Sequence, residues 1–93
     1  MRIRWTQPAA RDLTKICDYI TEHDSAANAR RVALSIYQRV SSLRQFPERG
    51  RPGRKKGTRE FVLGGLPYLA IYRVEHEVAE ILRVLRGAQD WPQ

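Results

Sequence analysis

The sequence is poor in cysteine and histidine, and it has no long apolar run. Its one cysteine, Cys17, excludes an internal disulfide and any metal site built from several cysteines. The two histidines, His23 and His76, stand singly, without a second ligand at the spacing of a metal site, so we expect no bound metal. No run approaches the roughly 20 apolar residues that span a bilayer, and residues 1–5 alternate charge with bulk instead of forming the apolar core of a signal peptide. We therefore expect a cytoplasmic protein without a membrane segment.

Catalytic and cofactor motifs are also missing. No serine stands in a nucleophile elbow, and Cys17 falls among apolar residues at helical spacing, where packing in the core is the expected role. The glycines at positions 50, 53, 64 and 65 lack the spacing of a phosphate-binding loop, so they indicate turns. The sequence therefore predicts neither a cofactor nor a small-molecule substrate.

What the sequence has in excess is positive charge. With 17 Lys and Arg against 10 Asp and Glu, the formal net charge is +7, which favours binding to polyanions or to acidic proteins. A chain of 93 residues forms one hydrophobic core, so we expect residues 1–93 to make a single domain. Such a domain has room for one binding site or one main interface.

The second half of the chain predicts a three-stranded antiparallel meander. Residues 59–63, 68–74 and 78–85 are rich in β-branched, aromatic and leucyl side chains, and they are separated by Gly64-Gly65 and by residues 75–77. The middle run alternates tyrosine and alanine on one face with branched aliphatic residues on the other. Both faces are therefore apolar, and at least one of them needs a cover.

The first half of the chain predicts that cover. Residues 2–6 alternate as a short strand, and Pro8 then suits the first turn of an amphipathic helix. After a break at Asp24 or Ser25, either of which can cap the next helix, a second amphipathic helix runs to about Gln45. Because the connection between them is short, the two helices are expected to be antiparallel neighbours.

These elements predict an α+β fold in the order β-α-α-β-β-β. An N-terminal strand joins a mainly antiparallel sheet that the C-terminal three-stranded meander completes, and an antiparallel helix hairpin packs on this sheet. Between the hairpin and the meander, residues 47–58 hold five cations together with proline and glycine. We expect them to form a loop without regular structure.

Cations and aromatic side chains form the candidate binding site. Arginine and lysine neutralise phosphates and flat rings stack on bases, so their combination favours nucleic-acid binding. The candidates are Arg54, Lys55, Lys56, Arg59, Arg73, Arg83 and Arg86, with Tyr68, Tyr72 and Trp91 nearby in sequence or strand register. A solvated loop explains the cations at positions 54–56 equally well. Arg83 lies within an apolar run and needs a target or a carboxylate, for which Glu80 and Glu60 are the candidates.

Several segments resemble the RelE/ParE superfamily of bacterial type II toxins, including its plasmid-stabilisation members. The matching segments are residues 8–13 (PAARDL), 46–54 (FPERGRPGR), 68–74 (YLAIYRV) and 81–91 (ILRVLRGAQDW). Together they extend over nearly the whole chain, in the order of the superfamily's elements. The resemblance implies a growth-inhibiting toxin that is neutralised by a cognate antitoxin, an acidic protein that folds as it binds.

The resemblance also implies one of two targets. RelE-like members cut mRNA in the ribosomal A site without a metal, whereas ParE-like members poison DNA gyrase. In the ribonuclease branch, lysines on the second strand, arginines on the third and fourth, and an aromatic hydroxyl near the C-terminus perform the cleavage. This chain has no lysine on its second strand, Leu69 in place of an arginine, and no tyrosine in its tail. The candidate catalytic residues are therefore Arg59, Tyr72, Arg83 and Arg86.

This incomplete catalytic set favours the ParE-like branch, in which a complementary surface replaces an active site. We expect the target-binding cations to line one positively charged hollow. The target-binding residues are then Arg54, Lys55, Lys56, Arg59, Arg73, Arg83, Arg86 and Trp91. The alternatives are a non-toxic basic nucleic-acid-binding protein and a degenerate toxin.

Overall fold

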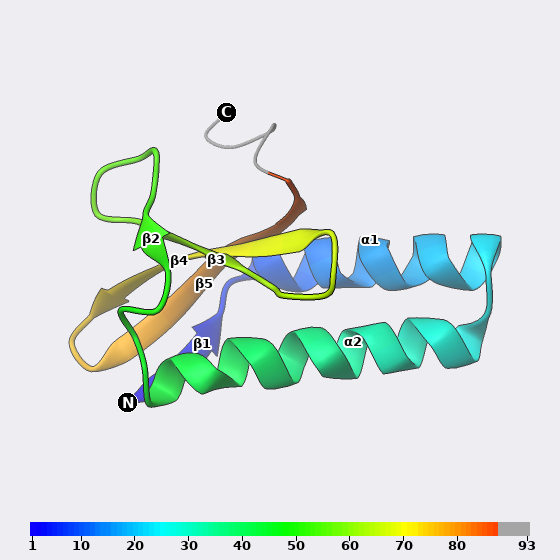
Figure 1. Ribbon diagram of the computed structural model, residues 1–93, viewed down its shortest axis with the longest axis horizontal. Helices are drawn as coiled ribbons and strands as arrows, with labels where there is room; N and C mark the ends of the chain where they lie inside the picture. The colour runs from blue at the N-terminus through cyan, green and yellow to red at the C-terminus, as the bar shows by residue number, and fades with distance from the viewer. Residues whose placement is uncertain (88–93) are drawn as a thin grey trace.

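The computed structural model describes residues 1–87, which form two helices on one side of a five-stranded sheet (Figure 1). The elements in chain order are β1 (Arg2–Trp5), α1 (Gln7–His23), α2 (Ala26–Ser41), the 3-10 helix η1 (Ser42–Arg44), β2 (Arg51–Pro52), β3 (Arg59–Val62), β4 (Tyr68–Glu75) and β5 (Val78–Arg86). This order confirms the predicted α+β fold. The predicted meander strands agree with β3, β4 and β5 to within one residue at each end.

The sheet has the strand order β1-β5-β4-β3-β2. The first strand lies parallel to the last, with Arg2 opposite Val78, and all other neighbours are antiparallel. The short strand β2 was not predicted, because Pro52 within the loop argued against regular structure. Pro52 is tolerated there since β2 is an edge strand and a proline at the edge loses no ladder hydrogen bond.

Polar side chains cap the N-termini of both helices. The Thr6 hydroxyl accepts a hydrogen bond from the backbone N–H of Ala9 at 3.2 Å, and Ser25 accepts one from Asn28 at 3.0 Å. Ser25 is therefore the cap of α2. The helix ends at Ser41, before the predicted Gln45, because the chain tightens into the 3-10 turn that follows.

The core lies between the helices and one face of the sheet. Its members from the helical half are Ala9, Val32, Ile36, Val40 and Leu43, and those from the sheet half are Leu63, Tyr68, Ala70, Tyr72, Ala79, Ile81 and Val84. The helix hairpin thus covers one face of the sheet, as the sequence predicted, and the structure shows that this is the face of β4 that carries Tyr68 and Tyr72. Cys17 is only half-buried and lies outside this cluster, so the prediction that it packs in the core was wrong.

Two further observations concern residues 1–87. No helix in this part of the chain is long and apolar enough to cross a membrane. Nor do three or more His, Cys, Asp or Glu side chains gather there in an arrangement that could hold a metal ion.

Candidate functional site

The basic loop, residues 51–58, is folded around a buried carboxylate. Glu60 on β3 is buried, and it accepts hydrogen bonds from the Arg51 guanidinium at 3.1 Å and from the backbone N–H of Arg54 at 3.3 Å. The loop also closes on itself, because the N–H of Gly53 donates to the carbonyl of Thr58 at 2.8 Å. Like charges alone would extend this segment, and these contacts hold it in one shape instead.

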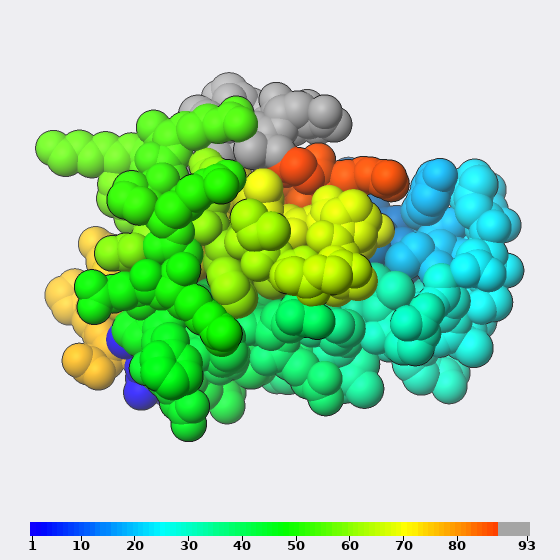
Figure 2. Space-filling view, viewed as in Figure 1, coloured from blue at the N-terminus to red at the C-terminus, as the bar shows by residue number. Residues whose placement is uncertain are grey.

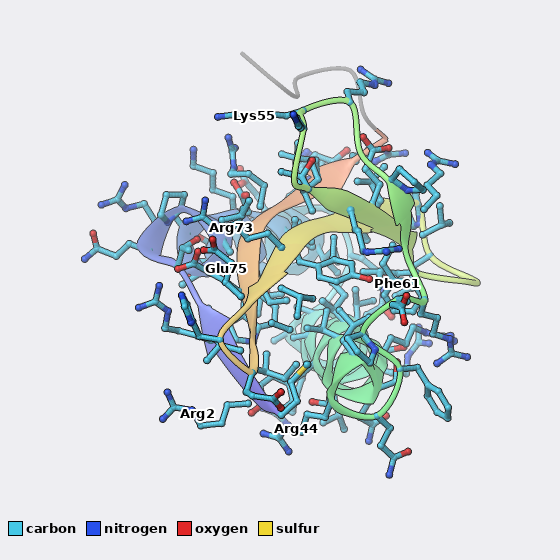
Figure 3. All side chains as sticks on the ribbon, turned by 90° about the vertical axis from the view of Figure 1, so that its left-hand side faces the viewer. Arg2, Arg44, Lys55, Phe61, Arg73 and Glu75 are labelled. Atoms are coloured by element: carbon cyan, nitrogen blue, oxygen red, sulfur yellow. The ribbon has the colours of Figure 1, made fainter. Side chains whose placement is uncertain are left out.

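A cleft of about 380 Å³ opens between this loop and the sheet. Its walls include Lys55 and Lys56 from the loop, Arg73 and Glu75 from β4, and Leu82 from β5, and we call it the basic cleft. Figure 3 shows Lys55, Arg73 and Glu75 on one side of the sheet, with Phe61 on the other side in that view. The cleft therefore combines positive charge with a few apolar side chains, which suits an anionic partner.

Arg73 is partly neutralised by carboxylates. Its guanidinium lies 3.0 Å from a carboxylate oxygen of Glu80 and 3.8 Å from one of Glu75, and Glu80 also pairs with Arg4 of β1. In the described part of the chain, neither Lys55 nor Lys56 has a carboxylate partner. The two lysines consequently supply most of the uncompensated charge in the cleft.

Arg59 and Tyr72 hold a neighbouring loop in place. The Tyr72 hydroxyl donates to the carbonyl of Pro47 at 2.6 Å and accepts from the N–H of Gly50 at 2.9 Å, while Arg59 donates to the Gly50 carbonyl at 2.6 Å. Burial raises the pKa of Tyr72, although the Gly50 hydrogen bond and the charge of Arg59 oppose this shift. We call this arrangement the 47–50 clasp.

The clasp removes Tyr72 from the candidate catalytic groups. The side chain of Tyr72 is fully buried, so it cannot reach a substrate outside the protein. A Cβ atom at Gly50 would lie 2.8 Å from the ring and the hydroxyl of Tyr72, so only glycine allows this close approach. The sequence showed the tyrosine but not the backbone that it holds.

Arg83 forms an ion pair with α1. Its Nε donates to Oδ2 of Asp12 at 2.7 Å and its Nη2 to Oδ1 at 3.0 Å, and Oδ2 also accepts from the N–H of Val84 at 3.0 Å. The predicted partners Glu80 and Glu60 were wrong, because each of these carboxylates is paired with other arginines. A buried carboxylate with three donors ties the first helix to the last strand.

A β-bulge interrupts the alternation of side chains along β5. Ile81 lies opposite Tyr72 and Arg83 opposite Ile71, so Leu82 is an extra residue between two paired positions. As a result Ile81 and Val84 both belong to the core although they are three residues apart. Strict alternation would have placed them on opposite faces.

The last two candidate site residues, Arg86 and Trp91, are not among the described residues that line the basic cleft. Arg86 is exposed and borders a separate groove of about 310 Å³ with Lys15, Ile16, Tyr19 and Tyr68. Trp91 lies outside the described residues. The basic cleft therefore brings together Lys55, Lys56 and Arg73, with Arg54 on the same loop, but not Arg59, Arg83 or Arg86. The cations of residues 1–87 do not share the one hollow that the sequence suggested.

Sequence reasoning missed a second surface, which adjoins the 47–50 clasp. Phe46 and Val62 are large apolar side chains that are 58% and 53% exposed, and the guanidinium of Arg49 lies over the rings of both Phe46 and Phe61. We call Phe46, Arg49, Phe61 and Val62 the Phe46 surface. The only signal in the sequence was a phenylalanine before Pro47 in a segment that otherwise reads as a polar loop.

Comparison with known proteins identifies relatives along the whole chain. Residues 3–91 match the family described as ParE toxin of type II toxin-antitoxin system, parDE. A putative toxin Y4kP of Sinorhizobium fredii is 49% identical over 92 residues, which is 99% of this chain and 94% of the relative. Toxin RelE2 of Caulobacter vibrioides is 36% identical over 88 residues, or 95% of this chain and 97% of the relative.

A solved structure supports the same assignment. The chromosomal ParDE TA system from P. aeruginosa contains a chain that superposes with a TM-score of 0.88 at 32% identity, covering 92% of this chain and 95% of the other. Family match, relatives and structural similarity agree with the resemblance that the motifs indicated. The chain belongs to the ParE toxin family of type II toxin–antitoxin systems, within the RelE/ParE superfamily.

Proposed function

We propose that this ParE-family toxin stops growth by binding its target through the basic cleft, without catalysis, and that the target is DNA gyrase. The observation that carries the proposal is that three candidate catalytic side chains already have internal partners. Tyr72 and Arg59 hold the 47–50 clasp, and Arg83 holds Asp12. Cleavage of RNA needs an acid, a base and cations directed at the reacting phosphate, and these side chains are directed at the protein itself.

A ribosome-dependent mRNA endoribonuclease is the second candidate. One relative, at 36% identity, carries the name RelE2. In this case Lys55, Lys56 and Arg73 would neutralise the charge of the phosphate, with Arg86 as a further cation. The reaction would require no metal.

The proposal includes a cognate antitoxin, and residues 1–93 acting as one toxin domain. The formal net charge of +7 favours an acidic partner, and a disordered acidic segment can fold as it covers such a surface. The gene for this antitoxin is expected beside the toxin gene.

Two assays distinguish the candidate targets. With purified, antitoxin-free toxin, a gyrase supercoiling reaction should accumulate cleaved DNA complexes, and an in vitro translation reaction should show no codon-dependent breaks in the mRNA. Codon-dependent breaks would establish the second candidate instead.

Variants connect the result to the basic cleft. Lys55→Ser/Lys56→Ser should lose gyrase inhibition and keep its fold, because exposed substitutions cost under about 0.5 kcal/mol. The matched control Arg30→Ser/Arg31→Ser removes two exposed charges from α2 and should inhibit gyrase like the wild type. If the Lys55→Ser/Lys56→Ser protein inhibits gyrase as strongly as the wild type, the basic loop does not bind the target and its lysines are only solvated.

A growth experiment separates toxins from the remaining alternatives. Induced expression of the toxin should arrest growth, and co-expression of the neighbouring gene should restore it. Absence of arrest with well-expressed, folded protein would favour a degenerate toxin or a non-toxic nucleic-acid-binding protein.

A further inference from the structure

The Phe46 surface is a second exposed surface, and it combines large apolar side chains with arginines. Two adjoining cavities of about 440 and 460 Å³ meet at Arg49; the first is lined by residues 45–49, and the second includes Arg39, Phe61 and Val62. Figure 2 presents the face on which the segment before β2, the turn between β3 and β4, and α2 come together. Exposed apolar side chains that gather in this way mark an interaction site more often than scattered ones do.

The surface is held rigidly. The guanidinium carbon of Arg49 lies 5.8 Å from the ring centre of Phe46 and 5.6 Å from that of Phe61, and its Nη1 donates to the hydroxyl of Ser42 at 3.0 Å. The 47–50 clasp fixes the backbone that carries Arg49. A partner would therefore meet a preformed surface and lose little affinity to the ordering of side chains.

The charge of the surface favours an acidic occupant. Arg39 and Arg49 line the cavities, and within the described part of the chain neither forms an ion pair with a carboxylate. Glu48 is the one carboxylate among the described lining residues. Aromatic and arginine side chains around an apolar centre have the composition of a protein interface.

Stacking of nucleic-acid bases fits this surface less well. The Arg49 guanidinium already lies over Phe46 and Phe61, so one face of each ring is covered. The exposed apolar surface beside them includes the branched aliphatic side chain of Val62, which offers no flat ring for stacking. Such surfaces complement leucine-like side chains rather than flat bases.

We propose that the Phe46 surface is the docking site for an acidic, amphipathic segment of the cognate antitoxin, and that it is separate from the basic cleft that binds the target. This proposal rests on the proposed function, in which an antitoxin neutralises the chain. None of the described residues that line the basic cleft lines the two cavities at the Phe46 surface. Phe61 and Arg73 also lie on different sides of the sheet in Figure 3.

The test uses a double variant and a matched control. Phe46→Ser/Val62→Ser removes two apolar side chains from the surface, and Tyr19→Ser/Leu34→Ser removes two that are 55% and 56% exposed on the helices. Calorimetric titration with the purified product of the neighbouring gene should show at least about 30-fold weaker binding for the first variant, as for loss of an interface hot spot. The control should bind within about threefold of the wild type.

Growth assays provide the second measurement. Cells that express Phe46→Ser/Val62→Ser should arrest like those with wild-type toxin, but the antitoxin should no longer rescue them. Arg49→Glu should weaken the antitoxin complex further than Arg49→Ala does, because it opposes an acidic partner.

Each outcome decides the proposal. If wild-type toxin arrests growth and antitoxin rescues both double variants equally, the docking site is wrong while the proposed function stands. If the helix control loses as much affinity as the Phe46 variant, the site is not specific. If only binding of a labelled single-stranded oligonucleotide is lost, the surface recognises nucleic acid. If the wild type causes no arrest, the proposed function fails first.

Discussion

Replacing Tyr72 by phenylalanine removes one oxygen atom from the centre of the 47–50 clasp and leaves the ring in place. In the wild type this oxygen donates to the Pro47 carbonyl at 2.6 Å and accepts from the Gly50 N–H at 2.9 Å. Gly50 is buried, so its N–H lies away from bulk water. The substitution therefore tests whether Tyr72 acts through structure or through chemistry.

The expected loss of stability follows from the two hydrogen bonds. The buried Gly50 N–H would be left without an acceptor, which costs about 1–3 kcal/mol. The Pro47 carbonyl is nearer to the surface and can bind water, so its loss adds about 0.5–1 kcal/mol. We expect Tyr72→Phe to lower the free energy of unfolding by roughly 2–4 kcal/mol, a large part of the roughly 5–15 kcal/mol typical of a domain.

Urea denaturation followed by circular dichroism measures this difference. The control is Tyr37→Phe, because the Tyr37 side chain is exposed and a phenylalanine can keep its stacking on Trp5. This control should stay within about 0.5 kcal/mol of the wild type. If the Tyr72→Phe protein is as stable as the wild type, the hydrogen bonds of the 47–50 clasp do not stabilise the fold. A stable but inactive Tyr72→Phe protein would instead return Tyr72 to the catalytic candidates.

Further predictions concern the other buried groups. Arg83→Met should cost about 3 kcal/mol, since it leaves the buried Asp12 carboxylate uncompensated, and the double change with Asp12→Met should cost less than Arg83→Met alone in the same urea assay. Burial raises the pKa of Tyr72 and of Cys17, so the folded protein favours the neutral forms of both side chains. Stability should be complete below the unfolded pKa values and should fall as the pH rises above about 9, less steeply in Tyr72→Phe. Glu60→Gln should speed tryptic cleavage of the basic loop at least severalfold, because a neutral amide holds the loop less strongly; an unchanged rate would contradict the anchoring role.

The fold was predictable because local patterns and global packing agree. Periodic apolar residues marked both helices, and β-branched runs bounded by Gly64-Gly65 marked the meander. Two features depended on pairing with distant residues instead. Strand β2 exists only because it lies beside β3, and the bulge at Leu82 exists only in the pairing of β5 with β4. A single sequence contains no signal for either.

The candidate site was less predictable, because the type of a residue does not show its partner. Arg83 and Asp12 are 71 positions apart, and only the packing of α1 on β5 joins them. The positive charge of Arg59 made it a candidate for catalysis and target binding, but its guanidinium donates a hydrogen bond to the backbone of the 47–50 clasp. Lys55 and Lys56 were placed correctly on a loop, but the sequence did not show that Glu60 shapes that loop.

The distribution of carboxylates explains where the surplus charge is exposed. Asp12, Glu60 and Glu80 are all buried, and each forms an ion pair with at least one arginine. Carboxylates that neutralise structural arginines in this way cannot balance the surface cations, so the excess charge remains on exposed cations that have no carboxylate partner within residues 1–87. Lys55 and Lys56 at the basic cleft and Arg49 at the Phe46 surface are such cations. Under the two proposals above, the Phe46 surface binds the antitoxin and the basic cleft binds the target, so toxicity and neutralisation should be separable by mutation.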